Sequence, residues 1–94
     1  MKIIDLDEAT RLVRQIARTG GVAIDRHCFF RMEERGVEIP DIRHLLVSGE
    51  VIHNPGDKTG RRFIVTGADI EGEPLRAAIV FLSRTSLLVI TVMG

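Results

Sequence analysis

The sequence predicts an α+β fold in which N-terminal helices pack on one face of a three- to four-stranded antiparallel sheet. Two observations support this class. Apolar residues in the first half recur at helical three- and four-residue intervals, whereas the second half changes to short apolar or alternating runs separated by turn residues. Consecutive strands joined by short turns are most simply antiparallel. We therefore expect helices at 6–18, 26–35 and 40–48, followed by strands at 50–54, 62–68, 74–82 and 87–93.

The first helix carries signals at both ends. Asp5 and Glu8 are spaced as a capping box at its start, and Gly20-Gly21 ends it. Its apolar side follows the helical spacing through Ala9, Leu12, Val13, Ile16 and Ala17. The other side carries three basic residues, which we interpret as a solvated face, with anion binding as the alternative: Arg11, Arg14 and Arg18.

The second helix has two chemically different sides. Asp25 precedes it as an N-cap, and Gly36 follows it as a left-handed C-cap residue. His27, Arg31 and Arg35 recur every four residues and therefore form one polar stripe along the helix. The apolar side beside this stripe consists of Cys28, Phe29, Met32 and Val37. We expect the lone cysteine on this apolar side to be a buried thiol.

The remaining elements follow from turn residues and β-type patterns. Val22-Ala23-Ile24 is a short extended piece, Pro40 lies in the first turn of the third helix, and Gly49 ends that helix. Leu75 to Leu82 is almost entirely apolar, as expected of a central strand. The residues that we expect to be largely buried are Ile16, Phe29, Met32, Leu45, Phe63, Ile79, Phe81 and Val89.

Size and charge limit the class of protein. The 94 residues suit a single domain, 1–94. Thirteen basic and thirteen acidic residues cancel, which counts against a dedicated nucleic-acid binder but does not exclude a local basic patch. The start of the chain lacks a secretory h-region, and no apolar run approaches the ~20 residues that span a bilayer. We therefore expect a soluble, cytoplasmic domain with no membrane contact.

Metal and cofactor sites have little support. One Cys and three scattered His lack the spacing of Cys-x-x-Cys or His-Glu-x-x-His zinc motifs. Gly56 and Gly60 flank Lys58 without the Lys-Ser/Thr ending of a nucleotide-binding loop. We expect neither a metal nor a cofactor.

The candidate catalytic residues are His27, Arg31 and Arg35, and a second cluster, RNA- or anion-binding, consists of Lys58, Arg61 and Arg62. A metal-independent ribonuclease needs a base for the ribose 2′-hydroxyl, an acid for the leaving oxygen and cations for the pentacoordinate phosphate. A histidine and two guanidiniums on a rigid helix suit this chemistry. The alternative is that Arg31 and Arg35 pair with carboxylates or carbonyls while His27 fixes the helix start. Whether the domain is an enzyme stays open on these residues alone.

Several spaced motifs resemble the family of domain of unknown function 4258. They cover about residues 24–93 and comprise His27-x-x-x-Arg31-Met32-x-x-Arg35-Gly36-Val37, Ile39 to Gly49-Glu50-Val51-Ile52, Arg62-Phe63-x-Val65-x-Gly67, Pro74-Leu75 and Val89-Ile90-Thr91-Val92. The resemblance implies a helix-plus-antiparallel-sheet fold like that of the RelE-type toxin ribonucleases. It also implies an RNA-cleaving or toxin–antitoxin role. Val92-Met93 stand where relatives commonly carry an aromatic residue, so a terminal tyrosine acid/base is absent.

Two function classes follow. The leading hypothesis is a small cytoplasmic domain that acts on RNA or on an antitoxin-like partner, with the His27/Arg31/Arg35 stripe in its site. The alternative is a non-catalytic protein-interaction module, a toxin–antitoxin partner or a homodimer formed by edge-strand pairing, in which the stripe is structural. If the stripe binds an anion, it should share one partly open concavity with Arg61 or Arg62 from the sheet.

Overall fold

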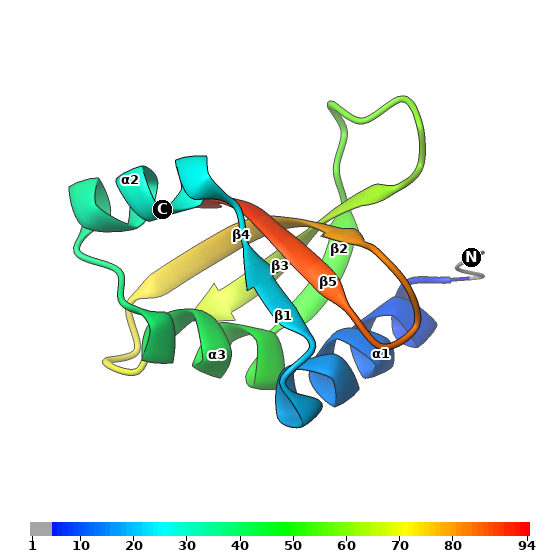
Figure 1. The fold of residues 1–94 in the computed structure, drawn as a ribbon, viewed down its shortest axis with the longest axis horizontal. Coiled ribbons are helices and arrows are strands. Elements are labelled where there is room, and N and C mark those ends of the chain that lie inside the picture. The colour runs from blue at the N-terminus through cyan, green and yellow to red at the C-terminus, as the bar shows by residue number, and fades with distance from the viewer. Residues whose placement is uncertain (1–4) are drawn as a thin grey trace.

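Residues 5–94, which the computed structural model describes, form three helices and one five-stranded sheet. The start of the chain, where no secretory signal was found, lies outside these residues. Helices α1 and α3 pack side by side on one face of the sheet, and α2 lies along β5 (Figure 1). In chain order the elements are α1 (Leu6–Thr19), β1 (Val22–Ile24), α2 (Arg26–Arg35), α3 (Ile39–Ser48), β2 (Glu50–His53), β3 (Arg62–Ala68), β4 (Pro74–Phe81) and β5 (Leu87–Met93).

The expected α+β class is confirmed, but the sheet has five strands where three to four were expected. Its order is β1-β5-β4-β3-β2, and β2 to β5 form the expected antiparallel meander. The additional strand is β1, which pairs with β5 in parallel. Backbone hydrogen bonds from Leu87 N to Gly21 O and from Asp25 N to Val89 O, both 2.9 Å, flank this pairing. Glycine is needed at position 21 because a Cβ there would collide with the Thr85 carbonyl.

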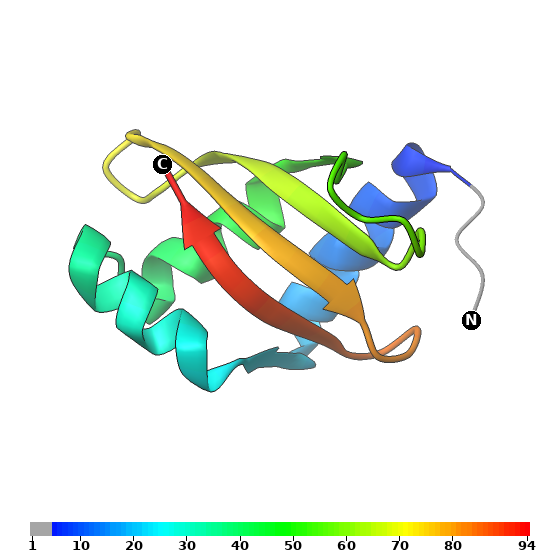
Figure 2. The ribbon, with the colours of Figure 1, turned by 90° about the horizontal axis from the view of Figure 1, so that it is seen from above.

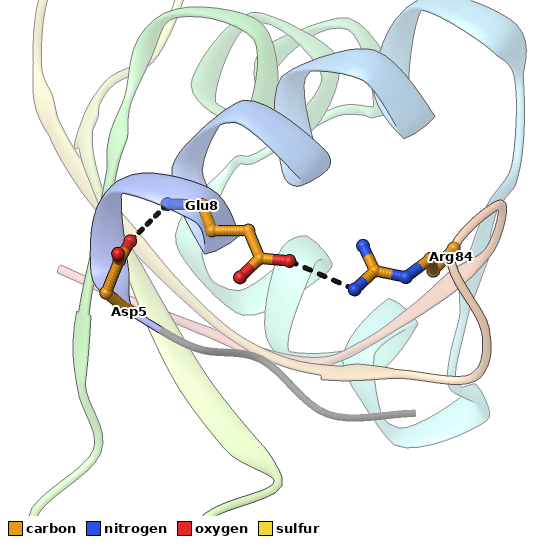
Figure 3. Close-up of polar contacts among 3 residues, drawn as sticks. All are labelled: Asp5, Glu8 and Arg84. Carbon is orange, nitrogen blue, oxygen red and sulfur yellow. Dashed lines mark hydrogen bonds and ion pairs between the residues drawn. The ribbon is translucent and has the colours of Figure 1, made fainter.

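Capping fixes the start of α1. The Asp5 carboxylate accepts a hydrogen bond of 2.7 Å from the Glu8 backbone N–H, which is the N-cap half of the expected capping box (Figure 3). The Glu8 side chain reaches Arg84, in the turn between β4 and β5, at 3.0 Å. The Arg84 side chain of this pair is 57% exposed, so the contact orients α1 against the sheet more than it stabilises the fold.

The core lies between the sheet and the α1–α3 layer. Six of the eight residues expected to be largely buried are buried, namely Ile16, Met32, Leu45, Phe63, Ile79 and Val89. Phe81 is only partly buried, although its ring packs edge-on against Phe63 with centroids 5.7 Å apart. Phe29 is 50% exposed, and the prediction that it is largely buried is wrong. Helix α2 lies at one side of the sheet and buries only Cys28 and Met32, which are one turn apart, so Phe29 falls outside the contact.

The two faces of the sheet differ. Because side chains alternate along a strand, every second residue of β3 and β4 points away from α1 and α3, and the same holds in β5 on either side of the register shift between Val89 and Thr91. The paired registers assign to this second surface Arg62, Ile64 and Thr66 of β3, Arg76, Ala78 and Val80 of β4, and Thr91 and Met93 of β5. We call it the open face, because Figure 2 shows α1 and α3 behind the sheet and no helix of residues 5–94 in front of it. Its central residues Ile64 and Ala78 are nevertheless buried, each 8% exposed, so its accessible side chains lie toward its borders.

None of the helices formed by the described residues combines the length and the apolar composition of a membrane-crossing segment.

Candidate functional site

The polar stripe on α2 is held in place by good local helix signals. The Asp25 carboxylate accepts a 3.2 Å hydrogen bond from the His27 backbone N–H, and Gly36 ends the helix at a φ of 66°. Cys28 and Met32 anchor the opposite side of the helix in the core. The side chains of His27, Arg31 and Arg35 are therefore aligned on a helix that is fixed at both ends, and all three are exposed.

These three side chains have no protein partner in the described part of the chain. Within residues 5–94, no carboxylate or carbonyl oxygen accepts a hydrogen bond from the side chain of Arg31 or Arg35. The His27 imidazole likewise has no hydrogen-bond or ion-pair partner there, because the Asp25 carboxylate accepts only from the His27 backbone N–H. The arrangement in which each arginine pairs with a carboxylate is therefore not formed. Arg35 lies in the last turn of α2, where a positive charge interacts favourably with the helix dipole.

The stripe lies at one border of the open face. Strand β1 pairs with the edge of the first part of β5, and α2 lies alongside the rest of that edge (Figure 2). At the end of β5, a Cβ added to Gly94 would lie 2.9 Å from the Nη1 atom of Arg35. On the open face, Nη2 of Arg76 donates a 3.0 Å hydrogen bond to the Gly94 carbonyl oxygen. Arg35 and Arg76 thus approach the same point from a helix and a strand.

Sequence reasoning missed Arg76. The alternation of β4 places Arg76 on one face with Ala78 and Val80, and that pattern was readable. Its closeness to Arg35 depends on the register in which Arg76 pairs with Met93, which no local pattern predicts.

The second predicted cluster lies at the other end of the molecule. Lys58 and Arg61 belong to the loop between β2 and β3, and Arg62 is the first residue of β3. Both ribbon views place this loop and α2 at opposite ends of the sheet (Figures 1 and 2). The structure therefore does not gather His27, Arg31 and Arg35 in one concavity with Arg61 or Arg62. Instead, the two groups of cations border the same open face from opposite ends.

A carboxylate organises the loop that carries the second cluster. Asp57 accepts hydrogen bonds from the backbone N–H of Arg62 at 2.8 Å and from the Thr59 hydroxyl at 2.7 Å. The Arg62 backbone N–H contributes most to lowering the pKa of Asp57 to about 2, and the Thr59 hydroxyl follows. The side chains of Lys58, Arg61 and Arg62 remain exposed.

The basic row on α1 has a different role from the stripe. Arg14 donates hydrogen bonds to the Gly49 carbonyl at 3.0 and 3.3 Å, and so caps the C-terminal end of α3. A cavity of about 320 Å³ adjoins it, and its lining includes the acids Asp7 and Glu50. These carboxylates disfavour an anion there, and Arg11 and Arg18 lie exposed, as a solvated face predicts.

Nucleophilic and metal chemistry find no support among the described residues. Cys28 is fully buried, as expected, and burial, reinforced by the Asp25 carboxylate, raises the pKa of its thiol. A thiol of raised pKa is a poor nucleophile. Within residues 5–94, no three His, Cys, Asp or Glu side chains are grouped so that they could hold a metal ion.

Comparisons with known proteins give one match. A family model described as "Domain of unknown function (DUF4258)" matches residues 24–94, from the last residue of β1 to the residue that follows β5. Helix α1 lies outside the match. Neither the curated proteins nor the solved structures contain a match to the chain.

Proposed function

The chain belongs to the DUF4258 family, and from this premise we propose that it binds RNA across the open face of its sheet, with the α2 stripe in contact with the phosphates. The observation that carries the proposal is the row of three exposed basic side chains on one side of α2, none with a protein partner among residues 5–94. Guanidinium groups bind phosphate oxygens through paired hydrogen bonds, and a fixed helix keeps them aligned for successive contacts.

The distribution of charge supports the same surface. The chain as a whole is neutral, yet the open face carries Arg62 and Arg76 and is bordered by the stripe at one end and by Lys58 and Arg61 at the other. The opposite face is covered by α1 and α3 and filled by core residues. Glu50 pairs with Thr66 at the β2 side, so the phosphates are expected nearer to β5.

The toxin-ribonuclease resemblance of the sequence suggests cleavage as the activity of this site. His27 is the titratable group of the stripe and would accept the proton of a ribose 2′-hydroxyl. The 2′-oxygen would then attack phosphorus while Arg31 and Arg35 stabilise the pentacoordinate phosphate. The imidazolium would return its proton to the departing 5′-oxygen, leaving a 2′,3′-cyclic phosphate.

Binding and cleavage are tested separately with the purified chain and a fluorescein-labelled single-stranded RNA. The double variant Arg31→Ala/Arg35→Ala should weaken binding about equally for every RNA sequence. It should also reduce the slope of log affinity against log salt by about 1.4, since each phosphate contact contributes about 0.7 for single strands. The matched control Arg11→Ala/Arg18→Ala removes the same charge from α1, on the far side of the sheet, and should leave binding unchanged.

His27→Ala should retain binding and abolish release of a cyclic-phosphate product. Growth arrest on induced expression, relieved by the same substitution, would be the cellular counterpart of this result. Equal loss of binding in the α2 and α1 double variants would show that the interaction is unspecific and would refute the site. Binding without cleavage would restrict the proposal to an RNA-binding domain.

The second candidate is a non-catalytic protein-interaction module, and the exposed aromatic pair on α2 favours it. Phe29 is 50% and Phe30 61% exposed, next to the stripe. Adjacent exposed Phe side chains are typical of protein interfaces. An antitoxin-like partner or a second copy of the chain would cover them. Harmless expression, no RNA binding and a complex lost on Phe29→Ser/Phe30→Ser would select this function.

A further inference from the structure

Strand β1 leaves one backbone edge of the sheet free. Val22, Ala23 and Ile24 pair with β5 on one side, and within residues 5–94 no strand pairs with the other side. The hydrogen bonds that use Gly21 O and Asp25 N point toward β5. Backbone groups alternate in direction along a strand, so the N–H and C=O groups of Val22 and Ile24 point outward. An incoming strand would meet four free backbone groups here.

An apolar pocket adjoins this edge on the helix side of the sheet. Its volume is about 160 Å³, and its walls include Ala17 of α1, Val22 and Ile24 of β1, and Ile39, Ile42 and Leu46 of α3. A cavity of this size holds one aliphatic or aromatic side chain. Ile39 is 49% exposed, so a side chain that entered would also cover apolar surface at the entrance.

The pocket carries one charge. Arg43 of α3 is its only charged lining residue, and the lining contains no acid. The Arg43 side chain is exposed and makes no hydrogen bond or ion pair with the described residues. The group that complements it is therefore a carboxylate next to an apolar side chain.

We propose that the β1 edge binds an extended segment of a partner protein, which adds to the sheet as a sixth strand. The segment has a Leu-x-Glu pattern, because residues two apart on a strand share one face. The leucine fills the pocket, the glutamate pairs with Arg43, and the backbone bonds to Val22 and Ile24. This is the β-augmentation mode, in which main-chain hydrogen bonds give affinity and pockets give specificity. The site lies on the helix side of the sheet and does not depend on RNA binding.

The experiment is an NMR titration of the isotope-labelled full chain with the synthetic peptide acetyl-KTVLTETK-amide. Amide shifts should be largest at Val22 and Ile24, with smaller shifts around Arg43. Replacing the peptide leucine by alanine should weaken binding about tenfold, since it removes most of a buried leucine side chain. Replacing the peptide glutamate by lysine should weaken it about threefold, as expected of an exposed ion pair.

A charge exchange separates recognition by Arg43 from a structural effect. Arg43→Glu should weaken binding of the glutamate peptide and strengthen binding of the lysine peptide by similar factors. Arg11→Glu makes the same charge change on α1, away from the pocket, and should alter the affinity of neither peptide. The unperturbed spectrum of each variant checks that it folds.

Three results would overturn the proposal. The first is the absence of shifts at Val22 and Ile24 at millimolar peptide. The second is equal or tighter binding of 4-methylpentanoate at the same residues, which would assign the pocket to a small carboxylic acid without use of the edge. The third is a concentration-dependent dimer in sedimentation that shifts the same amides without peptide, which would assign the edge to a second copy.

Discussion

Helices α1 and α2 are alike in their local signals and unlike in their use. Each begins at an aspartate whose carboxylate accepts a hydrogen bond from a backbone N–H, and each ends at a glycine with positive φ. Yet α1 buries five residues against the sheet and α3, whereas α2 buries two. The exposed surface of α2 presents two phenylalanines and the His27/Arg31/Arg35 stripe, whose side chains have no partner among residues 5–94. Good caps thus form a helix whether it serves the core or a binding surface. The number of residues that the helix buries distinguishes the two roles.

The comparison predicts that α1 is the more sensitive to core truncation. Ile16 is 1% exposed in the main core, so Ile16→Ala should lower the free energy of unfolding by about 2–5 kcal/mol through lost burial and the remaining cavity. Urea denaturation followed by circular dichroism measures this. A loss below 1 kcal/mol would mean that α1 contributes less to the core than its packing indicates.

The two caps provide a sharper test. Asp5→Ala and Asp25→Ala each remove one capping hydrogen bond, and each should weaken its helix by about 1 kcal/mol. We expect Asp25→Ala to speed amide exchange within α2 alone, because two buried residues let this helix open without the rest of the fold. Hydrogen exchange with residue resolution reports this. Equal acceleration throughout the sheet would show that α2 is not a separate unit.

The loop between β2 and β3 is stabilised differently from the two helices, because a single carboxylate, that of Asp57, orders the segment that carries its exposed cations. The pKa of Asp57 is lowered from its ordinary value of 3.8 to about 2. Its contribution to stability is therefore complete above about pH 4 and is lost as the pH falls toward 2. Asp57→Asn should flatten the stability profile over this interval relative to the wild type. Because Asp57 lies in a surface loop, where solvent screens its charge, the change should be small. An unchanged profile would mean that the charge of Asp57 does not stabilise the loop.

The smallest effect is expected on the exposed side of α2. Phe30 is 61% exposed, so Phe30→Ser should change the free energy of unfolding by no more than about 0.5 kcal/mol. Thermal unfolding of this variant beside Ile16→Ala gives the direct contrast between the two helices. A loss of more than 1 kcal/mol would place Phe30 in a structural contact and weaken the interpretation of α2 as a binding surface.

The helices and the antiparallel strands were predictable because their signals are local. The second helix was expected at 26–35 and is observed at Arg26–Arg35, and the third and fifth strands match at 62–68 and 87–93. Asp25 and Gly36 mark the ends of α2 by their own chemistry, whatever surrounds them. The alignment of His27, Arg31 and Arg35 is equally local, since it depends only on the helical period.

The pairing of β1 was not predictable in the same way. Val22-Ala23-Ile24 was predicted to be extended, but its partner is β5, the last strand in chain order. Whether an extended piece becomes a strand depends on that distant partner and on the close approach that Gly21 permits. Helical spacing likewise assigned Phe29 to the apolar side of α2. It could not predict that the contact between α2 and the sheet would be too narrow to bury Phe29.

The sequence by itself determined the class of fold, the ends of the helices and the alignment of the stripe, because caps, turns and periodicity act over a few residues. Tertiary structure alone decided three further features: the parallel β1–β5 pair, the exposure of Phe29, and the separation of the Lys58/Arg61/Arg62 cluster from the stripe. It also brought Arg76 of β4 to the end of β5 beside Arg35. Each of these depends on which distant segments meet, and that is set by the packing of the whole chain rather than by any local pattern.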